Sequence, residues 1–252
     1  MPTIKTARGE IWFADHRRRR PALPALLIHG AGGSHLSFPK ELRRHAAWDA
    51  IAPDLPGHGK SAGAGHSQIA DYALDMLALL DALEIECALL AGHSMGGAIA
   101  QWLALEHGNR ARGLTLIGTG ARLPVNPALI HAIVAQPAET RARLLRWMWS
   151  PGAPTEMVAA SAAILEKTTP SVIQQDLLAC DRFDIRARLG DIHAPALVIA
   201  GEADNMTAPA LSEELVANLE NAKLVTLAGG SHMAHLEAPF ATAAAIGDWL
   251  AG

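Results

Sequence analysis

The chain has 252 residues, half of them apolar and 4% aromatic, and a formal net charge of −4 at pH 7. This length suits one large α/β domain with a mostly aliphatic core, and the mildly acidic balance predicts no nucleic-acid partner. No apolar run approaches the ~18 residues of a membrane span, and the first residues lack the pattern of a secretory signal. We therefore expect no membrane span and a cytoplasmic location.

The first third of the chain alternates short apolar runs with helical patterns, as βα units do. Residues 3–7 and 10–16 are predicted to form two strands. The four arginines at 17–20 are interpreted as a solvated turn rather than a site for an acidic partner. Further predicted strands cover residues 24–29, 49–53, 86–91, 112–118, 195–200 and 222–228.

Helical patterns lie between these strands. Apolar residues at helical spacing predict a helix over residues 67–83, with Ser67 as its N-cap. Other helices are predicted from residue 95 to about 107, over 210–219 and over 239–252. This alternation of strands and helices is the one expected of βα units.

The alternation stops between residues 121 and 193, where the composition becomes helical and prolines recur. We predict that residues 1–120 and 194–252 form the α/β core and that residues 121–193 form a helical cap. Sites in open parallel sheets form at the carboxyl ends of the strands. The turns that follow the strands are therefore the places to look for chemistry.

One such turn, Gly92-His93-Ser94-Met95-Gly96, matches G-x-S-x-G between a predicted strand and a predicted helix. Small residues are needed there because the serine backbone is strained and side chains at the two glycines would collide with neighbouring elements. The turn presents Ser94 as a nucleophile at a helix N-terminus, where the N–H of Met95 can stabilise an oxyanion.

A serine hydroxyl needs a base, and the base needs an orienting acid. The turn after 195–200 supplies Asp204, which we favour over Glu202 because Glu202 lies nearer the strand end. The turn at residues 118–120 carries no acid. After the last strand, His232 follows three small residues and is predicted to be the base. His235, three residues later, suits capping or packing.

A second oxyanion donor is expected in the turn at residues 29–33, where small residues let the N–H of Ala31 approach a substrate. We interpret His29, His58 and His93 as structural. The chain has twelve histidines, but none shows the spacing of a metal site with a third ligand nearby. No metal and no cofactor are therefore expected, and Cys87 and Cys180 are interpreted as reduced thiols.

Together these segments resemble the α/β-hydrolase superfamily over nearly the whole chain, in particular its small capped esterases, lactonases and meta-cleavage-type hydrolases. The resemblance is carried by HGAGG (29–33), DLPGHGKS (54–61), GHSMGG (92–97), GEADNMTAP (201–209) and GGSHMAHLEAP (229–239). It implies about eight strands, mostly parallel with the second antiparallel, and a cap after the sixth. One departure is Ser231, at a place where a glycine often precedes the base.

The predicted function is hydrolysis of carboxylic esters by a Ser94-Asp204-His232 triad through an acyl-enzyme, with a small-molecule ester as substrate. Serine at the elbow argues against haloalkane dehalogenases and epoxide hydrolases, which carry an aspartate there. The same triad would serve a lactonase, a C–C bond hydrolase or a cofactor-free perhydrolase, and a ligand receptor with residual hydrolysis is a further alternative. The sequence leaves the natural substrate and the oligomeric state open.

Apolar side chains of the predicted cap and of the two late turns suggest an apolar acyl pocket of small to medium size. The candidates for its lining are Leu123, Val125, Trp147, Met148, Met206 and Met233. A C–C hydrolase acting on a charged dienoate should need a basic residue in this pocket. Arg122 and the arginines at 141, 143 and 146 are instead interpreted as a solvated helix face.

Overall fold

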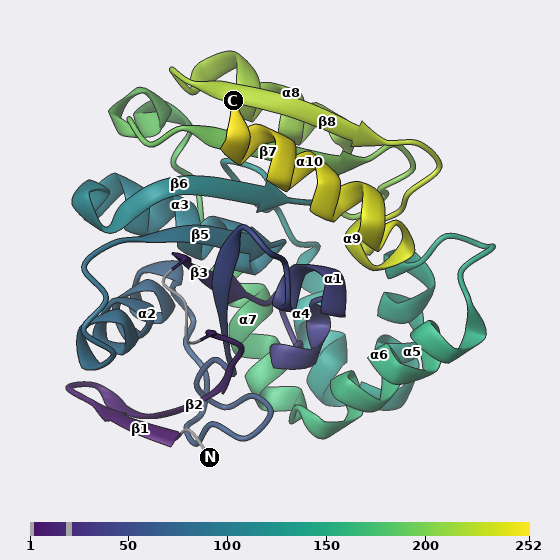
Figure 1. The fold of residues 1–252 in the computed structure, drawn as a ribbon. Coiled ribbons are helices and arrows are strands. Elements are labelled where there is room, and N and C mark those ends of the chain that lie inside the picture. Colours follow the sequence, from purple (N-terminus) through teal and green to yellow (C-terminus); the bar gives the residue numbers. More distant parts are fainter. Residues whose placement is uncertain (1–2, 19–21) are drawn as a thin grey trace.

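The sheet has eight strands in the order β1-β2-β4-β3-β5-β6-β7-β8 (Figure 1). The structure is a computed structural model that describes residues 3–18 and 22–252. Its strands are β1 (Thr3–Thr6), β2 (Gly9–Asp15), β3 (Leu23–Ile28), β4 (Trp48–Pro53), β5 (Ala88–His93), β6 (Ala111–Ile117), β7 (Ala196–Gly201) and β8 (Ala222–Leu227). Among the described strands, β2 alone runs opposite to the common direction: it pairs antiparallel with β1 and β4, and all other pairs are parallel. The predicted fold class, with its eight strands and antiparallel second strand, is confirmed.

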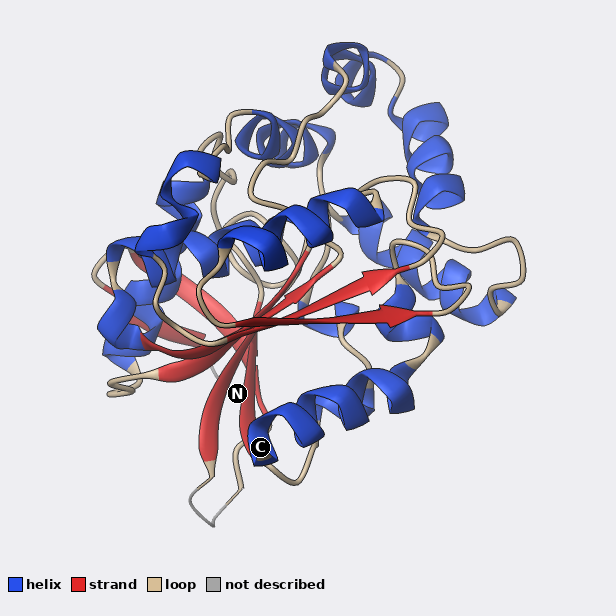
Figure 2. Ribbon diagram, turned by 90° about the horizontal axis from the view of Figure 1, so that it is seen from above, coloured by secondary structure: helices blue, strands red, loops and turns tan. Residues whose placement is uncertain are grey.

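The helices cover both faces of the sheet (Figure 2). They are α1 (Lys40–Arg43), α2 (Ile69–Ala82), α3 (Met95–Glu106), α4 (Pro127–Ala135), α5 (Pro137–Met148), α6 (Thr155–Lys167), α7 (Pro170–Asp181), α8 (Pro209–Asn218), α9 (Ala234–Glu237) and α10 (Pro239–Ala251), with short 3-10 turns η1 (His35–Ser37), η2 (Gly108–Arg110) and η3 (Arg186–Asp191). The prediction that Ser67 is the N-cap of α2 is wrong. Gln68 occupies that position and makes no side-chain cap, and the hydroxyl of Ser67 instead accepts a hydrogen bond from Arg182 at 2.9 Å.

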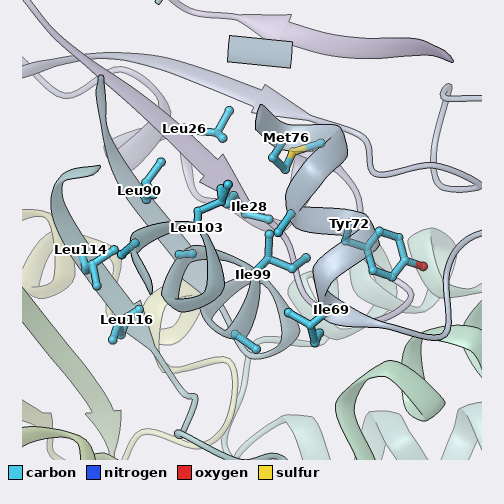
Figure 3. Close-up of a cluster of buried hydrophobic side chains, with 14 of the residues drawn as sticks. Leu26, Ile28, Ile69, Tyr72, Met76, Leu90, Ile99, Leu103, Leu114 and Leu116 are labelled. Carbon is cyan, nitrogen blue, oxygen red and sulfur yellow. The ribbon is translucent and has the colours of Figure 1, made fainter. Parts of the chain in front are cut away.

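Two apolar clusters, one on each face, hold the sheet between its helices. Figure 3 shows the first, in which strand residues meet α2 and α3; its members include Leu26, Ile28, Leu90, Leu114, Leu116, Tyr72, Met76, Ile99 and Leu103. On the other face, Leu27 and Trp48 pack with Leu42 of α1 and Ile246 of α10. The central strands are buried on both sides, which explains why they appear in the sequence as continuous apolar runs rather than alternating ones.

Two residues of the arginine run, Arg17 and Arg18, follow β2 and form ion pairs. Arg17 pairs with Asp15 at 2.8 Å, and Arg18 pairs with Asp49 at 3.1 Å. Both guanidinium groups remain partly exposed, as a solvated turn requires. Arg19 and Arg20 lie outside the described residues.

Residues 121–193, here called the helical segment, leave the sheet after β6 and return to it at β7. The two ends of the segment are tied together, since Ile185 N–H donates to the carbonyl of Ala121 and Arg122 forms an antiparallel bridge with Asp184. Helices α4 to α7 share an apolar cluster of their own, formed by Leu129, Ile130, Ile133, Leu144, Leu165, Ile173 and Leu177. The division into a core and a cap remains a prediction.

The first cluster gives a direct test of the packing. Leu90 on β5 is fully buried, so Leu90→Ala should lower the free energy of unfolding by about 2–5 kcal/mol through lost contacts and a residual cavity. Leu224 on the edge strand β8 is 36% exposed, and Leu224→Ala is the matched control with an expected change below about 1 kcal/mol. Urea unfolding of both variants measures the difference; equal losses would contradict this description of the core.

Candidate active site

Ser94 is the single residue between β5 and α3. Its backbone has φ +54° and ψ −120°, a conformation that costs about 1–3 kcal/mol for a non-glycine residue. A Cβ at Gly92 would overlap the carbonyl of Gly96, and a Cβ at Gly96 would overlap the carbonyl of Ile28 on β3. Both glycines are therefore required by the close approach of α3 to the ends of β3 and β5.

Neighbouring backbone and side-chain groups hold this strained turn. The N–H of Ser94 donates to the carbonyl of Ile117 on β6 at 2.9 Å, and the hydroxyl of Thr119 donates to the carbonyl of Ser94 at 2.9 Å. From the sequence, the turn at residues 118–120 is predicted only to carry no acid. The structure gives Thr119 a supporting role in that turn.

His232 and Asp204 form a buried pair, with Nδ1 and Oδ2 2.9 Å apart. Because the carboxylate oxygens of an ionised acid only accept, Nδ1 carries the proton of this bond. Thr207 supports the acid twice: its hydroxyl donates to Oδ2 at 2.7 Å and its N–H donates to Oδ1 at 2.9 Å. Burial alone would raise the pKa of Asp204, but the hydrogen bond and charge of His232, with these bonds from Thr207, lower that pKa below its ordinary value.

Ser94 and His232 line the same two adjoining cavities. The larger has a volume of about 260 Å³ and the smaller about 60 Å³. Ala31, Leu177 and Met206 also border both. No Asp, Glu, Lys or Arg is among the described residues that line either cavity. The arrangement therefore places a hydroxyl and an acid-supported imidazole on an uncharged, mostly apolar space.

The backbone N–H groups of Met95, which follows Ser94 in the chain, and of Ala31, which borders both cavities, have no acceptor among the described residues. Met95 is the first residue of α3, so its N–H has no partner within the helix. Within residues 3–18 and 22–252, the N–H of Ala31 also has no hydrogen-bond acceptor. Gly32 is different, because its N–H donates to the carboxylate of Asp176 at 2.8 Å. Ala31 and Met95 are the oxyanion donors that the sequence predicts, and that role stays a prediction.

His29 and His93, two buried histidines near the site, are neutral and hold backbone groups. His29 donates from Nδ1 to the carbonyl of Gly30 and accepts at Nε2 from the N–H of Leu55, which requires the uncharged ring. Burial lowers its pKa to about 4. His93, whose pKa burial also holds well below its ordinary value, donates from Nε2 to the carbonyl of His232 at 3.0 Å.

His235 lies in α9, buried, and donates from Nε2 to the carbonyl of Ser37 at 2.9 Å. Burial lowers its pKa to about 4. Glu202 is exposed and accepts from the N–H of Gly229. Neither residue lines the two cavities, so the geometry keeps them apart from Ser94.

All six candidate pocket residues border the two cavities. Leu123, Val125, Trp147 and Met206 line the larger one, and Met148, Met206 and Met233 line the smaller one. Arg122 is exposed, and neither it nor the arginines at 141, 143 and 146 are among the described residues that form the walls. The sequence analysis missed other wall residues, namely Asn126, Leu129, Leu165, Ile173, Leu177, Cys180, Asn205 and Leu211. Several of them lie at apolar helical positions, a pattern that indicates core packing as readily as a pocket.

Cys180 borders the larger cavity as a free thiol. Burial, with the nearby carboxylates of Asp176 and Asp181, raises its pKa far above the ordinary value. It therefore stays protonated and is a poor nucleophile.

Across the described part of the chain, no group of three or more His, Cys, Asp or Glu side chains could hold a metal ion. None of the helices described is long and apolar enough to cross a membrane.

The helical segment is bonded to the loop that carries His232. The N–H of Met233 donates to the carbonyl of Met148 at 3.0 Å. Glu237 bridges the two parts, since its carboxylate accepts from the N–H of Ser150 and from the N–H of Ser231, each at 2.8 Å. This joins the end of α5 to the base loop through three backbone N–H groups.

Comparisons with known proteins agree with this architecture. The pimeloyl-[acyl-carrier protein] methyl ester esterase of Neisseria meningitidis serogroup B is 29% identical over 256 residues, covering 94% of this chain and 98% of that protein. The 3-oxoadipate enol-lactonase 2 of Acinetobacter baylyi is 30% identical over 236 residues, covering 86% and 84%. The crystal structure of the enol-lactonase from Burkholderia xenovorans LB400 has the same fold, with a TM-score of 0.92, 24% identity and full coverage of both chains.

A sequence model described as the alpha/beta hydrolase family matches residues 25–245, which include the elbow, both late turns and the helical segment. The relatives named above are hydrolases of esters and lactones by their names. The match spans most of the chain. The protein is therefore a hydrolase and a member of the alpha/beta hydrolase family.

Proposed function

We propose that the protein is a serine esterase in which Ser94, His232 and Asp204 act as nucleophile, base and acid. One observation carries the proposal: Ser94 and His232, whose imidazole is bonded to Asp204, border one apolar space that Ala31 also lines. This matches the requirements for acyl transfer, namely a nucleophile, an oriented base and an oxyanion site.

In the proposed mechanism, Ser94 Oγ attacks the ester carbonyl while Nε2 of His232 takes its proton. The same proton then goes to the leaving alcohol, and water attacks the acyl-enzyme by the reverse sequence. Asp204 fixes the tautomer of His232 and stabilises the imidazolium. The N–H groups of Ala31 and Met95 bind the oxyanion, and loss of one such donor typically costs about 10²–10³ in rate.

The two cavities support a substrate class. A water-sized group takes about 30 Å³, so the smaller cavity, of about 60 Å³, holds two or three heavy atoms. By the same measure, the larger cavity of about 260 Å³ holds roughly eight or nine. We assign the acyl chain to the larger space and a small alcohol, such as methanol or ethanol, to the smaller one. The methyl ester named for the Neisseria relative fits this division.

The helical segment acts in this proposal as the cap that forms one wall of both spaces. A charged dienoate substrate of a C–C hydrolase finds no Lys or Arg among the described lining residues, so this alternative is not favoured. Lactone hydrolysis uses the same chemistry on a cyclic ester, as the name of the Acinetobacter relative indicates. Perhydrolysis would show itself as peracid formation from acetate and hydrogen peroxide.

Removal of the nucleophile is the first test. Ser94→Ala should abolish hydrolysis of methyl hexanoate, with a loss of at least about 10⁴ in kcat, since the acyl-enzyme cannot form. A fluorophosphonate probe should label the native protein at Ser94, seen by peptide mass spectrometry, and leave the variant unlabelled. Circular dichroism controls for folding. A folded variant that keeps native turnover would refute the proposed nucleophile.

A second test concerns the acid. Asp204→Asn should lower kcat by about 10⁴ because an amide favours the wrong tautomer of the imidazole.

The lowered pKa of Asp204 also predicts how this carboxylate contributes to stability as pH changes. The stabilising contribution of this carboxylate is complete above its ordinary pKa and is lost as pH falls through the lower, folded-state pKa. Chemical unfolding from pH 7 down to pH 2 should therefore show native and variant proteins converging only at the acid end; convergence near neutral pH would contradict the assignment.

The size of each compartment can be measured with two ester series. Methyl esters of C4 to C12 acids vary the acyl part, and methyl to hexyl esters of octanoic acid vary the alcohol. In a pH-stat assay, kcat/KM should pass through a maximum near a medium acyl chain and fall once the alcohol exceeds about three heavy atoms. The opposite ranking, with short acyl groups and long alcohols preferred, would overturn the assignment of the two spaces.

A further inference from the structure

The helical segment holds both polar backbone groups of Gly32, the residue that follows the proposed oxyanion donor. The N–H of Gly32 donates to Oδ2 of Asp176 on α7 at 2.8 Å. The carbonyl of Gly32 accepts from the hydroxyl of Thr168, just before α7, at 3.3 Å. Asp176 and Thr168 are themselves buried.

Asp176 is an uncommon residue for this position, because it is a fully buried acid on an otherwise apolar face of α7. A buried carboxylate is tolerated when it is hydrogen-bonded and paired. Besides Gly32, it accepts from the hydroxyl of Tyr72 on α2 at 2.5 Å and from Nε2 of His58 in the turn after β4 at 2.8 Å. Three separate parts of the core thus converge on one side chain of the helical segment.

The hydrogen bonds of His58 show that its imidazole is protonated and forms an ion pair with Asp176. Nδ1 lies 3.1 Å from the carbonyl of Pro56, which only accepts, and Nε2 faces the carboxylate of Asp176. Both ring nitrogens therefore donate, which is the protonated form. Burial lowers the pKa of His58, but the charge and hydrogen bond of Asp176 outweigh burial and raise it. The ion pair keeps the Asp176 carboxylate available as an acceptor for Gly32.

We propose that Asp176, assisted by Thr168, is a positioning residue that aims the N–H of Ala31 at the oxyanion through its hold on Gly32. The proposal rests on the esterase function and on the role of Ala31 in it. It assigns to the helical segment a part in the catalytic step, in addition to forming the wall of the pocket.

The backbone geometry allows this hold to reach Ala31. The peptide unit between Ala31 and Gly32 is planar, so fixing the N–H of Gly32 fixes the carbonyl side of Ala31. Gly32 has φ +64°, and the turn closes with the N–H of Gly33 on the carbonyl of Gly30 at 3.1 Å. Leu165 of α6 lies so near that a Cβ at Gly32 would overlap it. A glycine-rich turn has little stiffness of its own, so the contacts with the helical segment supply it.

The test compares Asp176→Asn with the native enzyme in methyl hexanoate hydrolysis and in the rate of fluorophosphonate labelling. The final extent of labelling counts folded sites, and kcat is expressed per labelled site. Since the oxyanion contact forms in the transition state, we expect kcat to fall about 10- to 100-fold while KM changes less than about threefold. The labelling rate should fall in parallel, because phosphonylation also builds negative charge on an oxygen.

Two further variants separate positioning from stability. Tyr72→Phe removes the bond to Oδ1 but leaves Oδ2 on Gly32, so it should lower Tm and change kcat per site by less than about twofold. Glu166→Gln on α6 removes an exposed acid of the helical segment, paired with Arg141, and should change neither quantity. Glu166→Gln matches the main variant in chemical type and lies in the same helical segment, and Tyr72→Phe removes a different partner of the same carboxylate.

The outcomes are distinct. A loss in kcat per site that is confined to Asp176→Asn supports the proposal. Unchanged kcat per site in that variant, or an equal loss in Tyr72→Phe, overturns it. If Asp176→Asn does not fold, Thr168→Val decides: a kcat about two- to fivefold lower supports the positioning role, and an unchanged kcat refutes it. Failure of the esterase proposal would look different, since the native protein would then neither hydrolyse esters nor react with the probe.

Discussion

The site depends on how closely the start of α3 approaches the ends of β3 and β5. Gly92 and Gly96 make this contact possible, and the carbonyl of Ile28 fills the space that a side chain at Gly96 would need. The approach forces Ser94 into a left-handed backbone conformation. It also places Met95 at the N-terminus of α3, next to Ser94, while Ala31 in the turn that follows β3 borders the same cavities as Ser94. The N–H groups of these two residues are the proposed oxyanion donors.

Around this contact, the loops are held by buried polar side chains rather than by regular backbone pairing. The imidazole of His29 joins the turns after β3 and β4, and that of His93 joins the elbow to the base loop. Thr119 bonds the carbonyl of Ser94, and Asp176 bonds Gly32 from the helical segment. These side chains make the hydrogen bonds that water would otherwise make to the loop backbone. Because they are buried, each of their polar atoms needs a protein partner. The turns at the carboxyl edge are therefore far more rigid than their glycine content suggests.

Much of this architecture can be predicted from the sequence, and the exceptions have physical causes. The central strands are buried on both faces and so appear as apolar runs, while the elbow follows from two glycines around Ser94. Periodicity shows that α7 is apolar on one side but does not tell which neighbour that side meets, so Leu177 in the pocket was not predictable. Asp176 could not be assigned because its three donors lie more than a hundred residues away in the chain. The hydroxyl of Ser67 was a plausible cap, but a guanidinium from the helical segment bonds it instead.

The bonds between Met148 and Met233, and those of Glu237 to two backbone N–H groups, have a consequence for how such enzymes diversify. A segment inserted at a single point of the chain is commonly regarded as an exchangeable module. Here it is bonded to the turn after β3 at Gly32 and to the loop of His232 at Met233. A chimera that takes residues 121–193 from a relative would therefore gain new pocket walls only if its donors and acceptors also matched the core at Gly32 and at Met233. Exchange of this segment within the family is therefore constrained by the hydrogen bonds to backbone groups at these two places as well as by the shape of the pocket.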